Sequence, residues 1–263
     1  MNRLAAITPR DGCAWVTGAS SGIGRAVALA LAQQGWRVAV SARGAAELAS
    51  LESEAAGLTG SIHSYPLDVT DPERAAQVCE AIWRDLGPIA LGIFNAGVYL
   101  PVELTAGAFD RQPFATSIQV NYLGVVNCLV PVASRQMARG SGYLVIVSSV
   151  TGYGGLPRAA AYGPTKAALI NLAESLKFDL DKAGVRISIV CPGFVDTPAT
   201  AGNPFPMPFL MPAGLAAQRI LAGIHRQDFE ITFPRRFTFM LKFLNLLPYA
   251  LYFPLVKRIT GWR

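Results

Sequence analysis

Tyr162 and Lys166 have the spacing of two side chains on one face of a helix. They lie four positions apart in the alanine-rich segment AAAYGPTKAAL, residues 159–169, and side chains at i and i+4 of an α-helix project from the same side. An ammonium group beside a phenol favours the phenolate and lowers the tyrosine pKa, so such a pair can transfer protons. A surface tyrosine beside a solvated lysine is the alternative, because this spacing alone is common in helices.

The elements that would position this pair are short apolar segments alternating with longer helical ones. Residues 24–35 and 166–184 have apolar side chains spaced by three and four, which is typical of helices. The alternation predicts an α/β fold, a doubly wound Rossmann-type domain of about seven parallel strands with helices on both faces. The predicted strands are 13–18, 37–43, 61–67, 89–97, 142–149, 185–193 and 229–234.

Ligands of such a sheet bind at the carboxyl ends of its strands, and the first strand runs into the loop TGASSGIGRA. Gly18 permits a tight turn, Gly22 a close approach to a pyrophosphate, and Gly24 close packing of helix on sheet. The next helix offers its N-terminal N–H groups to phosphates. Strand, loop and helix in this order favour nucleotide binding over a plain glycine-rich turn. The expected loop contacts are Gly18, Ser20, Ser21, Gly22, Ile23 and Gly24.

These motifs resemble those of the short-chain dehydrogenases/reductases, in order from residue 13 to about residue 200. The matching motifs are the loop Thr17–Gly24, Asp68 in LDVT, NAG at 95–97, Asn121 in VNYLG, Ser149, YGPTK at 162–166 and PGFVDT at 192–197. The resemblance implies an oxidoreductase that interconverts an alcohol and its ketone or aldehyde, by hydride transfer with a nicotinamide cofactor.

The resemblance also implies a catalytic set of Asn121, Ser149, Tyr162 and Lys166. Tyr162 would transfer a proton to or from the substrate oxygen, which Ser149 would also contact. Lys166 would lower the tyrosine pKa and hold the nicotinamide ribose. Asn121, in the helix before the fifth strand, would support a proton-relay water. Ser149 rather than Ser148 has the family's spacing to the tyrosine; a turn serine and a buried structural asparagine are the alternatives for Ser149 and Asn121.

Further cofactor contacts implied by the resemblance lie at later strand ends. Asp68 and the Val69 amide would hold adenine, and Thr197 would bind the nicotinamide carboxamide. The small residues of the NAG motif would let the backbone pass close to the cofactor. Besides Tyr162 and Lys166, the implied contacts are Asp68, Val69, Asn95, Ala96, Gly97, Pro192, Gly193, Val195 and Thr197.

The end of the second strand favours NADP over NAD. Family members that use NAD tend to carry an acid there, which accepts hydrogen bonds from the ribose hydroxyls and repels a 2′-phosphate. Here Ala42 stands at that position and Arg43 follows it. An arginine fork with Ser41 nearby suits a phosphate. Arg43 as a solvated charge at a helix entry is the alternative.

Composition places this chemistry in one large domain, expected over residues 1–234. Hydrophobic residues make up 52% and charged residues 15% of the 263, which indicates a filled core. The four cysteines form no Cys-x-x-Cys motif, and residues 1–12 lack the apolar run of a signal peptide. We therefore expect a cytoplasmic protein with reduced thiols, no metal site and no nucleic-acid partner, which assembles as a homodimer or homotetramer.

Two C-terminal segments bear on the substrate and on partners. Residues 194–214, approximately, are rich in Pro, Phe and Met, so the pocket that they cover should take a hydrophobic carbonyl or alcohol. Residues 235–263 are apolar and carry six basic and no acidic residues, which accounts for the net charge of +6. Lys242, Pro248 and Pro254 interrupt this tail and disfavour a membrane span.

The tail leaves two interpretations open. It could lie peripherally on the anionic inner face of a membrane, or it could pack over the active site or across a subunit interface. A catalytically silent nucleotide-binding regulator and a membrane-associated interaction module are the competing functions. The complete catalytic set argues against the first of these.

Overall fold

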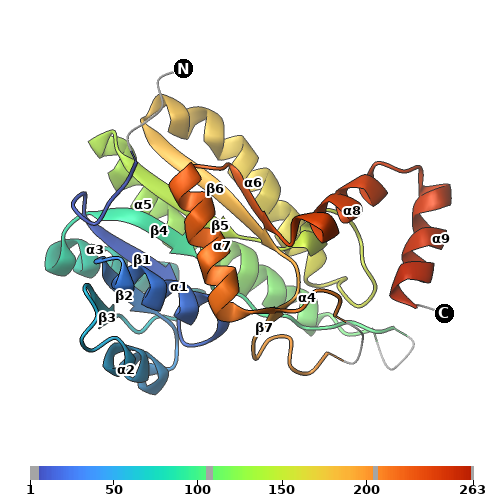
Figure 1. Ribbon diagram of the computed structural model, residues 1–263, viewed down its shortest axis with the longest axis horizontal. Coiled ribbons are helices and arrows are strands. Elements are labelled where there is room, and N and C mark those ends of the chain that lie inside the picture. The colour runs from blue at the N-terminus through green and yellow to red at the C-terminus, as the bar shows by residue number, and fades with distance from the viewer. Residues whose placement is uncertain (1–5, 105–108, 204–206, 262–263) are drawn as a thin grey trace.

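The computed structural model describes residues 6–104, 109–203 and 207–261 (Figure 1). All seven predicted strands form, and they pair in parallel in the order β3-β2-β1-β4-β5-β6-β9. The doubly wound α/β prediction is therefore confirmed. The strands are β1 (Cys13–Thr17), β2 (Arg37–Ser41), β3 (Ser61–Ser64), β4 (Ile89–Phe94), β5 (Gly142–Val147), β6 (Val185–Pro192) and β9 (Glu230–Phe233).

Helices cover both faces of this sheet, which is why its strands are apolar at nearly every position. Successive residues of β1 point to opposite faces: Ala14 and Val16 join one buried cluster, and Cys13 and Trp15 join the other. The first face is covered by α1 (Gly22–Gln33), α2 (Ala45–Glu54) and α7 (Ala213–Arg226), and the second by α3 (Pro72–Leu86), α5 (Gly124–Arg139) and α6 (Gly163–Lys182).

A long helical run precedes β5. It begins as α4 (Gln112–Ser117), continues through the π-helical segment η1 (Ile118–Leu123) and ends with α5. The run Gln112–Arg139 is long and apolar enough to cross a bilayer by length and composition alone. However, Val125, Leu129 and Val132 are buried in the core, and α5 packs against α3. One side of the run is therefore packed in the domain, while Ile118, Val130 and Met137 are exposed on it.

The two ends of the segment expected to cover the substrate are joined by a pair of short strands that the sequence analysis did not predict. β7 (Val195–Asp196) pairs in parallel with β8 (Met211–Pro212). Residues 204–206 of this segment lie outside the described residues. The pairing returns the chain to the segment that follows β6, and α7 begins directly after β8.

The tail folds back on the domain as two helices, α8 (Arg235–Asn245) and α9 (Tyr249–Thr260). They extend from the β9 edge, and α9 lies at the outer end of the molecule (Figure 1). Their inner faces pack on Val150 of the 3-10 helix η2 (Val150–Gly152). The predicted boundary after residue 234 coincides with the start of α8. One face of the tail packs on the rest of the protein, as the second interpretation of the tail expects.

Candidate active site

A cavity of about 1740 Å³ lies at the carboxyl ends of the central strands, where the strand order reverses between β1 and β4. Most of the predicted site residues line it. These are Gly18, Ser20, Ser21, Gly22, Ile23, Arg43, Asp68, Val69, Asn95, Ala96, Gly97, Ser149, Tyr162, Lys166, Pro192, Gly193, Val195 and Thr197. Three predicted residues do not line it: Gly24, Ser41 and Asn121.

The glycine loop is built so that only glycine fits. Gly18 and Gly22 have φ values of +66° and +56°, which side chains rarely allow. A Cβ on Gly24 would lie 2.3 Å from the Gly18 carbonyl oxygen. Gly24 therefore lets the start of α1 pack closely on the backbone of the glycine loop. The amide of Asn95 donates to the carbonyls of Thr17 and Gly18, at 3.1 Å each. This bond joins the loop to the end of β4.

Thr17 is a site residue that the sequence interpretation missed. Its Oγ1 accepts hydrogen bonds from the backbone N–H groups of Asn95, at 3.1 Å, and Ala96, at 3.2 Å. The two strand ends on either side of the switch point are thereby held together. Its place directly before Gly18 was visible in the sequence, but its partners, more than seventy residues away, were not.

At the far end of the cavity Asp68 is held as a carboxylate. The Thr70 backbone N–H donates to it at 3.0 Å and the Thr70 hydroxyl at 2.8 Å. The backbone bond is the main cause that holds the Asp68 pKa below its usual range, and the positive charge of Arg43 adds to it. Arg43 itself is exposed and lines the cavity. An acceptor and a cation therefore stand at the end where the resemblance places the adenosine.

The expectation for Ser41 is wrong. Its side chain is fully buried, and its hydroxyl accepts a hydrogen bond from the Trp15 indole N–H at 2.9 Å. Ser41, the last residue of β2, points to the face of the sheet where Trp15 is buried and not toward the cavity. Alternate residues of a strand face opposite sides of the sheet. The cavity-lining residues at this strand end are Ala42, Arg43 and Gly44.

Tyr162 stands at the N-cap of α6, and Pro164 falls in the first turn of that helix, where proline is tolerated. Burial raises the pKa of Tyr162 to about 12, while its hydrogen bond with Ser149 acts in the opposite direction. The expected lowering by Lys166 is therefore not observed in this structure. At neutral pH Tyr162 is a phenol, which can donate a proton.

The orientation of Lys166 explains this difference. Its Nζ donates to the Val147 carbonyl at 2.9 Å and lies 5.4 Å from the centre of the Tyr162 ring. Burial lowers the pKa of Lys166 to about 8, so the amine is mostly charged at pH 7. A Cβ on Gly97 would lie 3.5 Å from Nζ. The ammonium group thus occupies the gap between the ends of β4 and β5.

Tyr99, a second missed residue, fixes the Tyr162 ring. The two rings meet edge to face, with centroids 5.3 Å apart and planes at 89°, a favoured aromatic geometry. Tyr99 lies two positions beyond the NAG motif, which was the available signal.

Asn121 is not part of the cavity wall, and its support of a proton-relay water stays a prediction. It is fully buried within η1. Its Oδ1 accepts from the Val98 N–H at 2.7 Å, and its Nδ2 donates to the Val98 carbonyl at 2.9 Å and to Thr165 Oγ1 at 3.3 Å. These bonds tie the segment after β4 to α6 directly beside Tyr162.

Ser148 has a structural role. Its hydroxyl donates to the Lys166 carbonyl at 2.8 Å, which secures α6 to the end of β5. Ser149 is then left as the serine whose hydroxyl interacts with Tyr162, and its contact with the substrate oxygen stays a prediction.

Much of the remaining wall is apolar, although polar side chains such as Gln119 and Arg258 also line it. Part of this apolar wall comes from the segment expected to cover the substrate and part from the tail. The lining residues of this part include Leu156, Phe194, Pro208, Phe237, Met240, Leu241, Ile259 and Gly261.

The thiols and acids of the described ranges form no second reactive centre. The four cysteines are free and buried, and burial raises the pKa of Cys13, Cys128 and Cys191 to about 12 and that of Cys79 to about 11. Within residues 6–104, 109–203 and 207–261, no three His, Cys, Asp or Glu side chains gather as a metal site requires.

Known structures share this architecture. The apo form of LigD from Sphingobium sp. strain SYK-6 is similar with a TM-score of 0.78 and 27% identity, over 88% of this chain and 93% of that one. A short-chain dehydrogenase/reductase from Burkholderia phymatum, in complex with NAD, has a TM-score of 0.79 at 22% identity, over 92% of this chain and 94% of that one. At that identity the second likeness concerns the fold alone.

Sequence relatives extend the comparison to the family. An uncharacterized oxidoreductase of Myxococcus xanthus (strain DK1622) is 37% identical over 255 residues, which is 94% of this chain and 96% of that protein. The 3-oxoacyl-[acyl-carrier-protein] reductase FabG of Thermotoga maritima is 34% identical over 189 residues, 72% of this chain and 76% of that protein. The family model described as short chain dehydrogenase matches residues 12–204. The chain therefore belongs to the short-chain dehydrogenase family of oxidoreductases.

Proposed function

We propose that this protein is an NADP(H)-dependent oxidoreductase that interconverts a hydrophobic alcohol and its ketone or aldehyde. The observation that carries the proposal is the meeting of Ser149, Tyr162 and Lys166 at the wall of one cavity, with Tyr162 as a neutral phenol. We place the enzyme in the cytoplasm, as a homodimer or homotetramer.

The residues on the cavity wall divide the chemistry between them. In the direction of reduction, Tyr162 donates its phenolic proton to the carbonyl oxygen, and the Ser149 hydroxyl donates a hydrogen bond to the same oxygen. The Lys166 ammonium, whose Nζ donates to the Val147 carbonyl, would hold the nicotinamide ribose. A bound nicotinamide supplies or accepts the hydride. In the direction of oxidation Tyr162 takes the proton from the alcohol.

The cavity fits a dinucleotide together with a substrate. Its volume of about 1740 Å³ exceeds the roughly 300–1,000 Å³ of a site for one small molecule. Gly18 and Gly22 bring bare backbone to its floor, next to the N-terminus of α1, which has no acid in its first turn. A pyrophosphate would meet N–H groups and no negative charge there.

Two features support NADP and a hydrophobic substrate. Arg43 lines the cavity beyond β2, where Ala42 leaves no carboxylate to repel a 2′-phosphate. At the other end Phe194, Phe237 and Leu241 line the wall near the tail, and such a surface favours apolar ligands.

The activity is tested by incubating the purified protein and NADPH with straight-chain ketones and aldehydes of increasing length. We expect NADPH oxidation, with a kcat/KM that rises along the series, because each buried CH₂ contributes about 0.8 kcal/mol. The absence of turnover across the whole series, with protein that binds NADPH, would leave the silent regulator as the better account.

The cofactor preference is tested by Arg43→Ala. We expect the unmodified enzyme to prefer NADPH over NADH, and the variant to lose about tenfold or more of that preference through the KM for NADPH, because the lost contact is remote from the reacting atoms. Arg219→Ala, which removes an exposed arginine of α7, serves as the control. Equal use of both cofactors by the unmodified enzyme would contradict the assignment.

A further inference from the structure

We propose that the outer face of α8 and α9, named here the tail surface (the exposed side chains of residues 235–261), docks on an anionic lipid membrane. This inference does not depend on the catalytic activity. It rests on the aromatic and basic side chains that α8 and α9 expose on the side opposite their buried faces.

The outer face of α8 is apolar where a water-facing helix carries polar side chains. Phe237, Leu241 and Leu244 are buried against the domain. On the opposite side Phe239 is 59% and Phe243 62% exposed, and their spacing of four places them on one stripe.

The outer face of α9 continues this apolar surface. Tyr252 and Val256 are buried, and Tyr249 and Phe253 are 75% and 56% exposed. The exposed rings stack on each other, with centroids 5.6 Å apart and planes at 22°. Leu246, in the turn between the helices, is 81% exposed. Clustered exposed apolar groups of this kind mark interaction sites.

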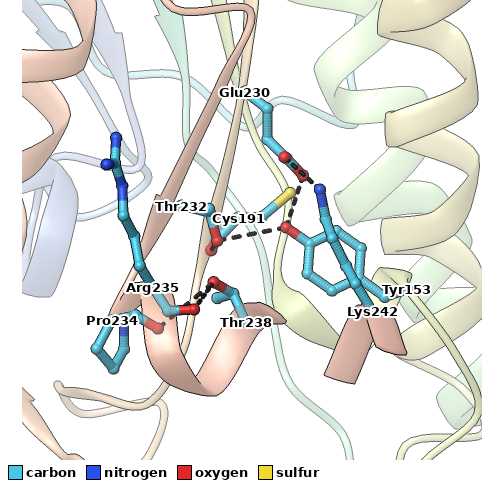
Figure 2. Close-up of polar contacts among 8 residues, drawn as sticks. All are labelled: Tyr153, Cys191, Glu230, Thr232, Pro234, Arg235, Thr238 and Lys242. Carbon is cyan, nitrogen blue, oxygen red and sulfur yellow. Dashed lines mark hydrogen bonds and ion pairs between the residues drawn. The ribbon is translucent and has the colours of Figure 1, made fainter. Parts of the chain in front are cut away.

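A polar cluster fixes which face of α8 looks outward. Lys242 donates to the Glu230 carboxylate, and the Tyr153 hydroxyl donates to Glu230 Oε1 at 2.7 Å and to Thr232 Oγ1 at 3.3 Å. Figure 2 shows these side chains meeting between α8 and β9, while the guanidinium of Arg235 points away from the cluster. The inner side of α8 thus packs against the domain, and Lys242 forms an ion pair with Glu230.

The charges at the edges of the tail surface select a lipid headgroup as its partner. Arg235 and Arg236 lie exposed at the start of α8, and Lys257 lies exposed near the end of α9. Arg258, next to Lys257, is also exposed and lines the cavity. Residues 231–263 contain no acid. Basic groups beside inserted aromatic side chains are the pattern of helices that lie in the interface of anionic bilayers.

The same charges disfavour a second copy as the occupant. A two-fold interface uses the same patch on both subunits, so a dimer centred on the tail surface would bring the arginines of the two copies together without acids from this segment to neutralise them. A membrane supplies the missing negative charge. Because Met240 and Ile259 of the same helices also line the cavity, docking would hold the cavity beside the bilayer.

The test is sedimentation of the full chain with vesicles of phosphatidylcholine, with and without about 30% phosphatidylglycerol, at about 0.05 M and 0.5 M salt. We expect binding to the anionic vesicles at low salt and its loss at high salt. Arg235→Gln/Arg236→Gln should lower the partition coefficient about tenfold or more, because the loss of each basic group near an anionic surface weakens binding about fivefold. Phe239→Ser/Phe243→Ser should lower it similarly.

Matched controls remove equivalent groups from other faces. Phe178→Ser removes a phenylalanine of α6 that is 73% exposed, and Arg10→Gln/Arg219→Gln removes two exposed arginines. Both should bind like the unmodified protein, and circular dichroism should show all variants folded. Equal binding of tail and control variants, equal binding to neutral vesicles, or no binding at low salt would each overturn the proposal. So would self-association that the tail variants abolish, without vesicle binding.

Discussion

Burial acts on Tyr162 and Lys166 in opposite directions, because a phenol is neutral when protonated and an amine is neutral when deprotonated. The pKa of the tyrosine rises to about 12 and that of the lysine falls to about 8. The hydrogen bond with Ser149 is the largest effect that opposes burial at Tyr162. At the residue scale, the burial of Tyr162 and its hydrogen bond with Ser149 therefore control proton transfer.

The first consequence is a pH dependence that differs between the two directions. Reduction uses the phenol, which is present below its pKa of about 12, and the Lys166 ammonium, whose charge is lost as pH rises through its pKa of about 8, so its kcat/KM should fall between about pH 7 and 10. Oxidation uses the phenolate, whose fraction rises as pH rises toward that pKa, so its kcat/KM should increase over the same range. Initial rates in both directions test this, and a flat profile for oxidation would contradict it.

The second consequence concerns the stability of the cofactor-free protein. Lys166 is buried, and a pKa lowered to about 8 means that its charged form costs free energy in the folded state. Lys166→Met should therefore raise the free energy of unfolding by about 1–3 kcal/mol at pH 7 while abolishing turnover. The gain should be full below the folded pKa of about 8 and shrink as pH rises toward the unfolded value of 10.5. Urea titrations at several pH values measure it; a loss of stability at pH 7 would refute it.

Residue types and spacing identified most of the cavity lining but not which way every side chain points. Ser41 was assigned to the cofactor from its place beside Arg43, and Trp15, distant in sequence, holds its hydroxyl instead. Likewise, nothing in the spacing indicated that Asn121 binds Val98. Hydrogen-bond partners far apart in the chain leave no trace in periodicity, so such roles follow only from the fold.

At the scale of elements, the seven strands were predictable because a doubly covered parallel sheet needs continuous apolar runs. The β7–β8 pair and η1 were not, since two-residue strands and a π-helical turn have no periodic pattern of their own. The tail helices were also missed, because exposed aromatic side chains such as Phe239 and Phe253 obscure the helical pattern. The cluster around Glu230 shows how α8 nevertheless takes a defined orientation.

This cluster gives an element-scale prediction. Lys242→Met removes the cation from Glu230 at a site where the two side chains are 38% and 28% exposed, and should destabilise the protein by about 1–3 kcal/mol. Lys182→Met is the control, because Lys182 and Asp179 form an ion pair at 3.6 Å with about 80% exposure, and such pairs contribute little. Thermal unfolding compares the two variants. Equal melting temperatures would show that the cluster does not anchor α8.

At the scale of the whole molecule, the tail completes a cavity whose other walls belong to the Rossmann domain. The family model ends at residue 204, yet residues 258–261 line the cavity. Deletion of residues 249–263 should raise the KM for long-chain carbonyls several-fold, because apolar wall is lost, and should change kcat for a short soluble carbonyl little. Steady-state kinetics along the chain-length series tests this. An unchanged KM for the longest substrate would mean that α9 does not contact it.

The central claim is that Tyr162 is the proton donor and acceptor of a nicotinamide-dependent reaction. The most direct measurement is the kcat of Tyr162→Phe for NADPH-dependent carbonyl reduction, together with the NADPH dissociation constant of the same variant. Tyr65→Phe, which alters a surface tyrosine bonded to Asp85 at 3.3 Å, is the control. We predict that Tyr162→Phe binds NADPH like the unmodified enzyme and loses about 10²–10⁴-fold in kcat, while Tyr65→Phe keeps its activity. A kcat for Tyr162→Phe within about twofold of the unmodified enzyme would contradict the account.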